Sequence, residues 1–163
     1  MSEVDTMNKR PSGEELQALH DKADAMVVPY SYKKPAEVGA AKGRINLAKT
    51  ENLRGVVQVV KKNGGENNLH YHTNSDSFWM VLKGRVRFYG PGDKLIGEFG
   101  PHEGTVTPRF SRYWFENAGE EDAELLQVSG LWKTGMTASS GRTDLEPQKF
   151  QIGNTPHFDA RKS

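Results

Sequence analysis

Residues 64–84, with the sequence GGENNLHYHTNSDSFWMVLKG, hold the clearest signal in the chain. His70 and His72 stand two positions apart near the middle of this stretch. Alternate side chains of a β-strand leave the same face, so both imidazoles would point to one side of a strand. A rigid strand can hold two imidazole nitrogens at about 2.0–2.1 Å from one metal ion. The spacing therefore predicts a strand that carries a candidate metal or ligand site.

The surrounding residues 43–133 consist of short apolar runs separated by turn residues. Runs rich in Val, Ile, Leu, Phe, Tyr and Trp alternate with Gly, Pro, Asn and Asp. This pattern predicts strands at residues 44–48, 55–62, 69–73, 77–83, 85–89, 94–99, 104–107, 113–117 and 124–132. No helical stretch separates these runs, which argues against a parallel α/β sheet. Many short strands with regular turns predict an all-β sandwich or barrel.

Residues 1–42 form a polar N-terminal arm with one helix signal. Ser12 and Glu15 have the spacing of a capping box. Apolar residues then recur at helical spacing, namely Leu16, Leu19, Ala23 and Met26. The pattern stops near Pro29. We therefore expect one helix, packed on the outside of the barrel.

Residues 134–163 form a polar C-terminal tail. Gly and Ser interrupt it, and its apolar residues Phe150, Ile152 and Phe158 are isolated. These side chains can anchor the tail on the barrel or on a second subunit, and a frayed terminus is the remaining alternative. The chain is thus predicted to hold one barrel domain, residues 43–133, between two arms.

The composition excludes several classes of function. The chain has 163 residues and no cysteine, which rules out disulfides, zinc fingers, iron–sulfur clusters and a catalytic thiol. The formal net charge is +1, and the basic residues are scattered, so neither a nucleic acid nor an anionic membrane is expected as a partner. No apolar run is long enough for a signal core or a membrane span, and we expect a cytoplasmic protein.

The histidine-containing stretch resembles the first motif of the cupin superfamily. That motif runs Gly, five residues, His, one residue, His, four residues, Glu, six residues, Gly. The sequence matches every spacing with Gly64, His70, His72 and Gly84, but Ser77 replaces the glutamate.

A second stretch is similar to the second cupin motif. That motif has a proline, a histidine five residues later and an asparagine four residues after that. Pro108 and Asn117 match, whereas Tyr113 replaces the histidine. The resemblance covers residues 43–133. It implies a single-domain cupin double-stranded β-helix, also called a jelly-roll barrel, here with an N-terminal helix.

The two replacements leave three interpretations open, because a typical cupin metal site has three histidines and one glutamate. In the first, His70, His72 and Tyr113 bind a divalent ion such as iron, manganese, nickel or zinc. Asp76 or water would complete the shell if a bulge turned Asp76 inward. In the second, the barrel binds an organic molecule without a metal. In the third, the site is a polar patch in a structural barrel.

The first interpretation predicts a metal-dependent enzyme that acts on a small organic molecule, for example a dioxygenase, an isomerase or a decarboxylase-like cupin. Tyr113 would then be a metal ligand or a general acid/base. The second predicts a metal-free cupin that binds or senses a small molecule. In either case we expect Ser77, Trp79, Gln58 and Gln127 to contact the ligand. Because exposed edge strands need cover, we also predict a homodimer.

Overall fold

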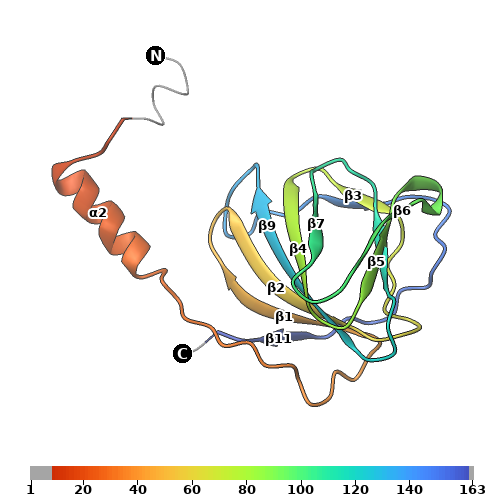
Figure 1. Cartoon of the computed structure of the whole chain (residues 1–163). Helices are drawn as coiled ribbons and strands as arrows, with labels where there is room; N and C mark the ends of the chain where they lie inside the picture. Colours follow the sequence, from red (N-terminus) through yellow and green to blue (C-terminus); the bar gives the residue numbers. More distant parts are fainter. Residues whose placement is uncertain (1–8, 162–163) are drawn as a thin grey trace.

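The structure is a computed structural model that describes residues 9–161, and a helical arm leads into a two-layered β-structure (Figure 1). The helix α2 (Gly13–Asp24) precedes the strands, and a short 3-10 helix, η1 (Pro91–Asp93), lies between two of them. The strands in chain order are β1 (Lys42–Lys49), β2 (Leu53–Val60), β3 (His70–His72), β4 (Ser75–Lys83), β5 (Val86–Tyr89), β6 (Leu95–Phe99), β7 (Gly104–Thr107), β8 (Trp114–Asn117), β9 (Ala123–Leu131), β10 (Arg142–Asp144) and β11 (His157–Asp159).

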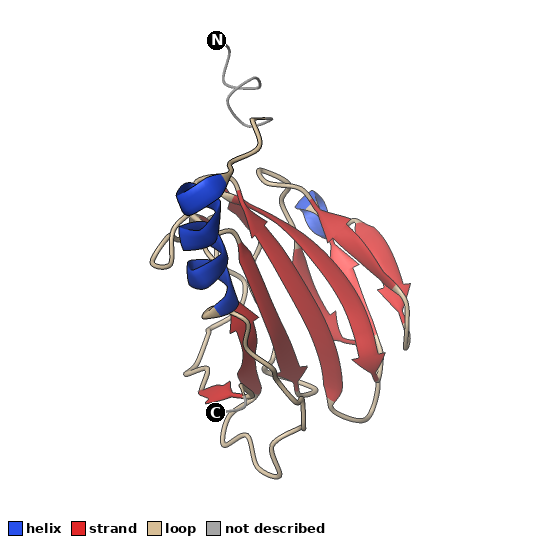
Figure 2. Ribbon diagram, turned by 90° about the vertical axis from the view of Figure 1, so that its left-hand side faces the viewer, coloured by secondary structure: helices blue, strands red, loops and turns tan. Residues whose placement is uncertain are grey.

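The strands form two layers that face each other (Figures 1 and 2). One layer is a six-stranded sheet with the order β11-β1-β2-β9-β4-β7. The other contains the three-stranded sheet β6-β5-β8 and the pair β10-β3. A bridge joins these two parts: the backbone N–H groups of His70 and Tyr113 each donate to the other residue's carbonyl, at 3.2 and 3.1 Å. The predicted all-β jelly-roll architecture is confirmed.

An aromatic core fills part of the space between the layers. Trp79 and Val81 on β4 are buried and point inward, as the alternation of the strand requires. The Trp79 ring packs edge-on against Phe88 and Phe115, with 5.4 Å between ring centroids in both pairs. Edge-to-face pairs stabilise a core by about 0.5–1.5 kcal/mol beyond the burial of their area.

The six-stranded sheet has a second apolar cluster on its outer face. Ile45 of β1 packs there with Val38 of the N-terminal arm and Phe158 of β11. Because the apolar side of β1 faces this outer cluster, the alternate residues Lys42 and Arg44 point into the interior of the barrel. This orientation decides the charge of the site described below.

Helix α2 forms where the sequence predicts a helix, but two expectations about it are wrong. Ser12 has the extended backbone of an N-cap, yet its side chain forms no capping hydrogen bond, so the capping box is absent. No residue of α2 is buried, and Figure 1 shows the helix standing away from the barrel. Leu16 and Leu19 are its only large apolar side chains, which is too little for a buried face. Within residues 9–161, no helix is long and apolar enough to cross a membrane.

The C-terminal tail lies on the barrel, which is one of the alternatives that the sequence left open. Strand β10 pairs with β3, and β11 runs parallel to β1. Between them, the Asn68 side chain both donates to the Phe150 carbonyl (2.8 Å) and accepts from its N–H (2.7 Å). The Phe150 ring packs on Trp114, with 5.1 Å between centroids. The tail thereby becomes part of the wall of the site.

Candidate ligand-binding site

A cavity of about 790 Å³ lies between the two layers, next to strands of both. Six of the site residues predicted from the sequence line it: His70, His72, Tyr113, Trp79, Gln58 and Gln127. Ser77, the seventh, is buried and hydrogen-bonds to the Gln127 side chain without lining the cavity itself. The structure therefore brings together side chains from strands far apart in the sequence.

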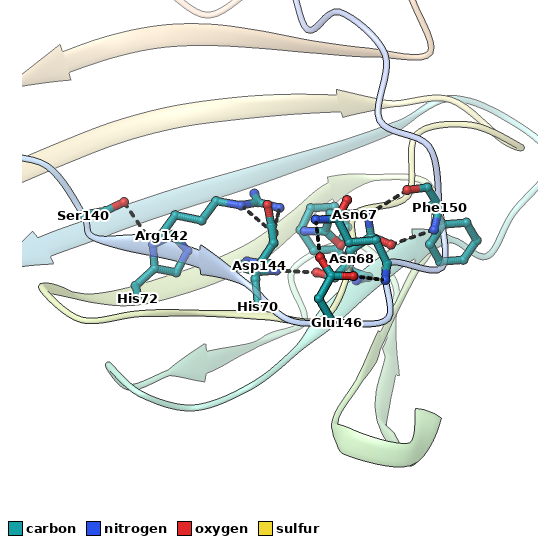
Figure 3. Close-up of polar contacts among 11 residues, drawn as sticks. Asn67, Asn68, His70, His72, Ser140, Arg142, Asp144, Glu146 and Phe150 are labelled. Carbon is teal, nitrogen blue, oxygen red and sulfur yellow. Dashed lines mark hydrogen bonds and ion pairs between the residues drawn. The ribbon is translucent and has the colours of Figure 1, made fainter.

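The two histidines project from β3 beside β10 (Figure 3). Their ring centroids are 5.2 Å apart. His70 Nδ1 lies 2.6 Å from the Asn68 carbonyl oxygen, which only accepts, so Nδ1 carries the proton and Nε2 keeps a lone pair. His72 Nδ1 is hydrogen-bonded to the Ser140 hydroxyl at 3.0 Å. Both rings are thus oriented by contacts of their Nδ1 atoms.

Both imidazoles are neutral at pH 7. Burial, together with the nearby Arg142 guanidinium, lowers the pKa of His70 to about 3 and that of His72 to about 4. A neutral imidazole can accept a hydrogen bond or bind a metal ion through its free nitrogen. The histidines therefore contribute no positive charge, and His70 offers its Nε2 as an acceptor.

Tyr113 stands opposite the histidines and contributes a neutral phenol. Its ring centroid lies 4.5 Å from that of His70. Burial raises the pKa of Tyr113 to about 12. At neutral pH its hydroxyl keeps its proton, so the group offers a hydrogen-bond donor rather than the phenolate that a metal ion would prefer.

A closed network of neutral side chains occupies the place of the motif's glutamate. The Ser77 and Ser129 hydroxyls are hydrogen-bonded at 2.8 Å. Gln127 Nε2 donates to both hydroxyls at 3.3 Å, and its Oε1 accepts from Gln58 Nε2 at 2.8 Å. These four buried side chains are hydrogen-bonded to one another, and none of them supplies a carboxylate.

Asp76, the nearest carboxylate in the sequence, does not replace that glutamate. Its Oδ1 accepts the backbone N–H of Arg109 at 2.8 Å, and its Oδ2 accepts Trp132 Nε1 at 3.2 Å. Asp76 does not line the cavity, because normal strand alternation turns it to the other face of β4. No bulge at this position brings it back, so Asp76 cannot complete a metal shell here.

These residues do not fit the usual cupin metal centre. Across residues 9–161, no group of three or more His, Cys, Asp or Glu side chains is arranged to hold a metal ion. The donors that remain are two imidazoles and one protonated phenol, two positions short of three histidines and one glutamate. Protein metal sites normally use at least three strong ligands of the His, Cys and carboxylate kinds.

Three basic residues of the cavity were not predicted from the sequence. Lys42 and Arg44 enter it from β1, and Arg142 enters it from β10, opposite His72 in the strand register. The Lys42 ammonium lies 4.7 Å from the centroid of the Phe115 ring. Burial and the two neighbouring guanidinium groups lower the pKa of Lys42 to about 7. The alternation of polar and apolar residues in 42–47 places Lys42 and Arg44 on one face of the strand, but it does not show that this face is the interior one.

The tail contributes further lining residues that the sequence analysis did not foresee. They include Ser140, Asp144, Gln148, Gln151 and Thr155. Asp144 binds Arg142 at 2.9 Å, next to the histidines in Figure 3. No motif marks these residues, because the tail is polar throughout.

Comparisons with known proteins identify the fold. Residues 56–129 match the family described as Cupin domain, and no curated protein matches the chain. A conserved protein with a double-stranded β-helix domain from Klebsiella pneumoniae is 17% identical, with a TM-score of 0.55 over 71% of this chain and 91% of that one. The cupin domain of Cnp3 from Schizosaccharomyces pombe is 18% identical, with a TM-score of 0.52 over 62% and 73% of the two chains. An oxalate oxidase in complex with the substrate analogue glycolate is 16% identical, with a TM-score of 0.53 over 70% and 60%.

Proposed function

The chain belongs to the cupin superfamily, and we propose that its barrel binds a small organic molecule with its own side chains rather than through a resident metal ion. The observation that carries this proposal is the neutral network at the glutamate position. Ser77 is hydrogen-bonded to Ser129 and Gln127 within the buried interior. A metal ion at the histidines would meet hydroxyl and amide groups there instead of an anionic ligand.

The cavity combines an aromatic patch with a mostly polar lining, which suits a polar organic molecule. Its floor is aromatic, since Trp79, Tyr113 and Phe115 belong both to the core and to the lining. Next to these aromatic rings lie the neutral imidazoles of His70 and His72 and the protonated phenol of Tyr113. Volumes of about 300–1,000 Å³ are common for small-molecule sites. The cavity volume of about 790 Å³ lies in this range.

A metal-dependent enzyme is the second candidate, and the position of His70 favours it. The Asn68 carbonyl fixes the proton on Nδ1 and leaves Nε2 free, which is the outer-shell arrangement common to metal-binding histidines. In that case His70, His72 and Tyr113 would hold iron, manganese, nickel or zinc. Such an ion would supply Lewis-acid or redox chemistry. The missing carboxylate makes this candidate the weaker one.

The two candidates are separated by a binding screen on chelator-treated protein. Thermal unfolding is followed with a panel of organic acids, amides, sugars and phenols, with and without added Zn²⁺, Mn²⁺ or Fe²⁺. The proposal predicts that at least one compound class raises Tm without metal, since binding to the folded state alone stabilises it. The same compounds should stabilise Tyr113→Phe less, whereas Tyr71→Phe, on the other face of β3, should respond like the wild type. Stabilisation that appears only with metal would contradict the proposal.

A further inference from the structure

The inner face of β1 carries two basic side chains into the barrel, next to its aromatic core. Lys42 and Arg44 are separated by one residue, so their side chains leave the same face of the strand, and both line the cavity. Across the register, Arg44 stands opposite Gln58, and Lys42 stands opposite the buried Val60. The core next to them is apolar and aromatic.

The acidic residues of the cavity do not neutralise these cations. Among the lining residues, Asp144 is engaged by Arg142 at 2.9 Å. Glu66 accepts the backbone N–H of Gly64 at 2.7 Å in an exposed position. Within residues 9–161, neither Lys42 nor Arg44 takes part in an ion pair. Two basic side chains in the cavity therefore lack an anionic partner.

Placing cations in such a position is costly for the folded protein. Moving a charge from water into a partly apolar cavity disfavours folding unless an opposite charge or several hydrogen bonds compensate. The ring of Phe115, 4.7 Å from the Lys42 ammonium, provides a cation–π contact, which is weaker than a buried ion pair. The missing compensation points to a ligand that carries the opposite charge.

We propose that the ligand of this cavity is a small organic acid whose carboxylate binds Lys42 and Arg44. This inference rests on the proposed function and specifies its ligand class. The planar guanidinium of Arg44 can donate two parallel hydrogen bonds to a carboxylate, and the Lys42 ammonium adds a third. The carbon skeleton then lies over the aromatic floor that includes Phe115 and Trp79. Remaining polar groups of the acid meet Gln58 and His72.

The test is calorimetric titration of the chelator-treated full-length chain with matched pairs of probes. Each pair is a carboxylic acid and its amide: benzoate and benzamide, glycolate and glycolamide, succinate and succinamide. The two members have nearly the same shape and differ in charge. We expect at least one acid to bind at least about tenfold more tightly than its amide, because charge-assisted hydrogen bonds are roughly twice as strong as neutral ones.

Single-residue variants test whether Lys42 and Arg44 cause the tighter binding of the acid. Lys42→Met and Arg44→Gln remove one charge each and should weaken binding of that acid about tenfold or more. Lys94→Met and Arg112→Gln make the same changes on exposed residues outside the cavity and should leave the affinity unchanged. Circular dichroism of each variant shows that the barrel is folded. If Arg44→Gln fails to fold, Lys42→Met alone decides.

The outcomes separate this inference from the proposed function. An acid that binds more tightly than its amide, with loss in Lys42→Met and Arg44→Gln, supports both. An amide that binds as tightly as its acid, with unchanged affinity in the two variants, overturns the organic-acid assignment and leaves the metal-free ligand site in place. Acid binding that appears only after a divalent metal is added overturns the proposed function instead. If none of the acids binds at millimolar concentration, the organic-acid assignment is overturned.

Discussion

Ser77 and Tyr113 stand at the two positions where the cupin motifs have a glutamate and a histidine. In the structure these two replacements have different effects. Ser77 forms part of a hydrogen-bonded network with Ser129, whereas Tyr113 lines the cavity as a protonated phenol. The backbone geometry of the motif is therefore preserved while its anionic ligand is lost.

Restoring the two motif residues should create a metal centre. We predict that the double variant Ser77→Glu/Tyr113→His binds about one divalent ion per chain, because it would combine three imidazoles with a carboxylate. The measurement is elemental analysis after dialysis against Mn²⁺ or Zn²⁺. The variant Tyr71→His/Phe78→Glu places the same residue types on the opposite faces of β3 and β4, and it should bind no more metal than the wild type. Equal metal content in both variants would refute this account of the motif positions.

The buried histidines should make the fold sensitive to acid. The pKa values of His70 and His72 are about 3 and about 4 in the folded protein, whereas an unfolded chain has about 6.5. Between these values the unfolded state binds more protons. The free energy of unfolding should therefore fall as the pH drops below about 6.5, by about 1 kcal/mol per pH unit for each histidine, and this fall should end below the folded pKa values.

Urea unfolding of the wild type and two variants from pH 7 to pH 4 measures this dependence. His72→Gln should lose part of the pH slope, because a glutamine does not titrate. His20→Gln removes an exposed histidine of helix α2 and should keep the wild-type slope. An unchanged slope in His72→Gln would show that His72 is not held neutral in the fold.

For strand β1, the sequence predicts the element but not which of its faces is the interior one. All nine predicted strands are present as β1 to β9, because alternating apolar residues and Gly, Pro and Asn turns mark them clearly. The cations of β1 were nevertheless missed. An apolar strand face is ordinarily assigned to the barrel interior, but here Ile45 faces an outer cluster with Val38 and Phe158. Only the three-dimensional structure, in which Val38 and Phe158 pack over the outer face of β1, shows that Lys42 and Arg44 point inward.

The two strands of the C-terminal tail could not be predicted from the sequence either. Strand β10 reads RTD and β11 reads HFD, and neither has the length or alternation of a recognisable strand. They form because each one hydrogen-bonds to a strand of the barrel: β10 pairs with β3, and β11 pairs with β1. The pairing of these strands also brings polar side chains of the tail to the cavity wall, although no motif in the tail predicts this.

Asn68 should control how firmly the tail is attached. Its side chain forms two hydrogen bonds with the backbone of Phe150, and it is buried. We predict that Asn68→Ala lowers the free energy of unfolding by about 1–3 kcal/mol, since the partners in the tail lose their hydrogen bonds. Hydrogen exchange should accelerate in residues 145–152. Asn154→Ala, at an exposed position of the same tail, should change neither quantity; slow exchange in the Asn68 variant would contradict the assigned anchor.

The outer face of the six-stranded sheet is partly uncovered. Phe78 and Val106 are directly opposite each other on β4 and β7, and they are 47% and 56% exposed. A mostly apolar groove of about 510 Å³ lies on the same sheet, lined by Leu47, Leu126 and Val128 among others. Exposed apolar surface of this kind usually marks an interface.

We therefore predict a homodimer that buries this face. Light scattering should give a mass near twice the 18.2 kDa of one chain. Phe78→Lys would place a charge in the interface and should shift the mass toward that of a monomer. Leu95→Lys places the same charge at a similarly exposed apolar residue of β6, in the other layer, and should leave the mass unchanged. If the wild-type protein has the mass of one chain at micromolar concentration, the predicted homodimer is contradicted.

On the proposed function, this barrel holds its ligand with side chains and not with a resident metal ion. Elemental analysis of protein purified without a metal-affinity column or chelator tests it most directly. We predict far less than one iron, manganese, nickel or zinc per chain, and the same low content in His70→Ala. About one metal ion per chain in the wild type, lost in His70→Ala, would contradict the claim and establish the metal-dependent cupin in its place.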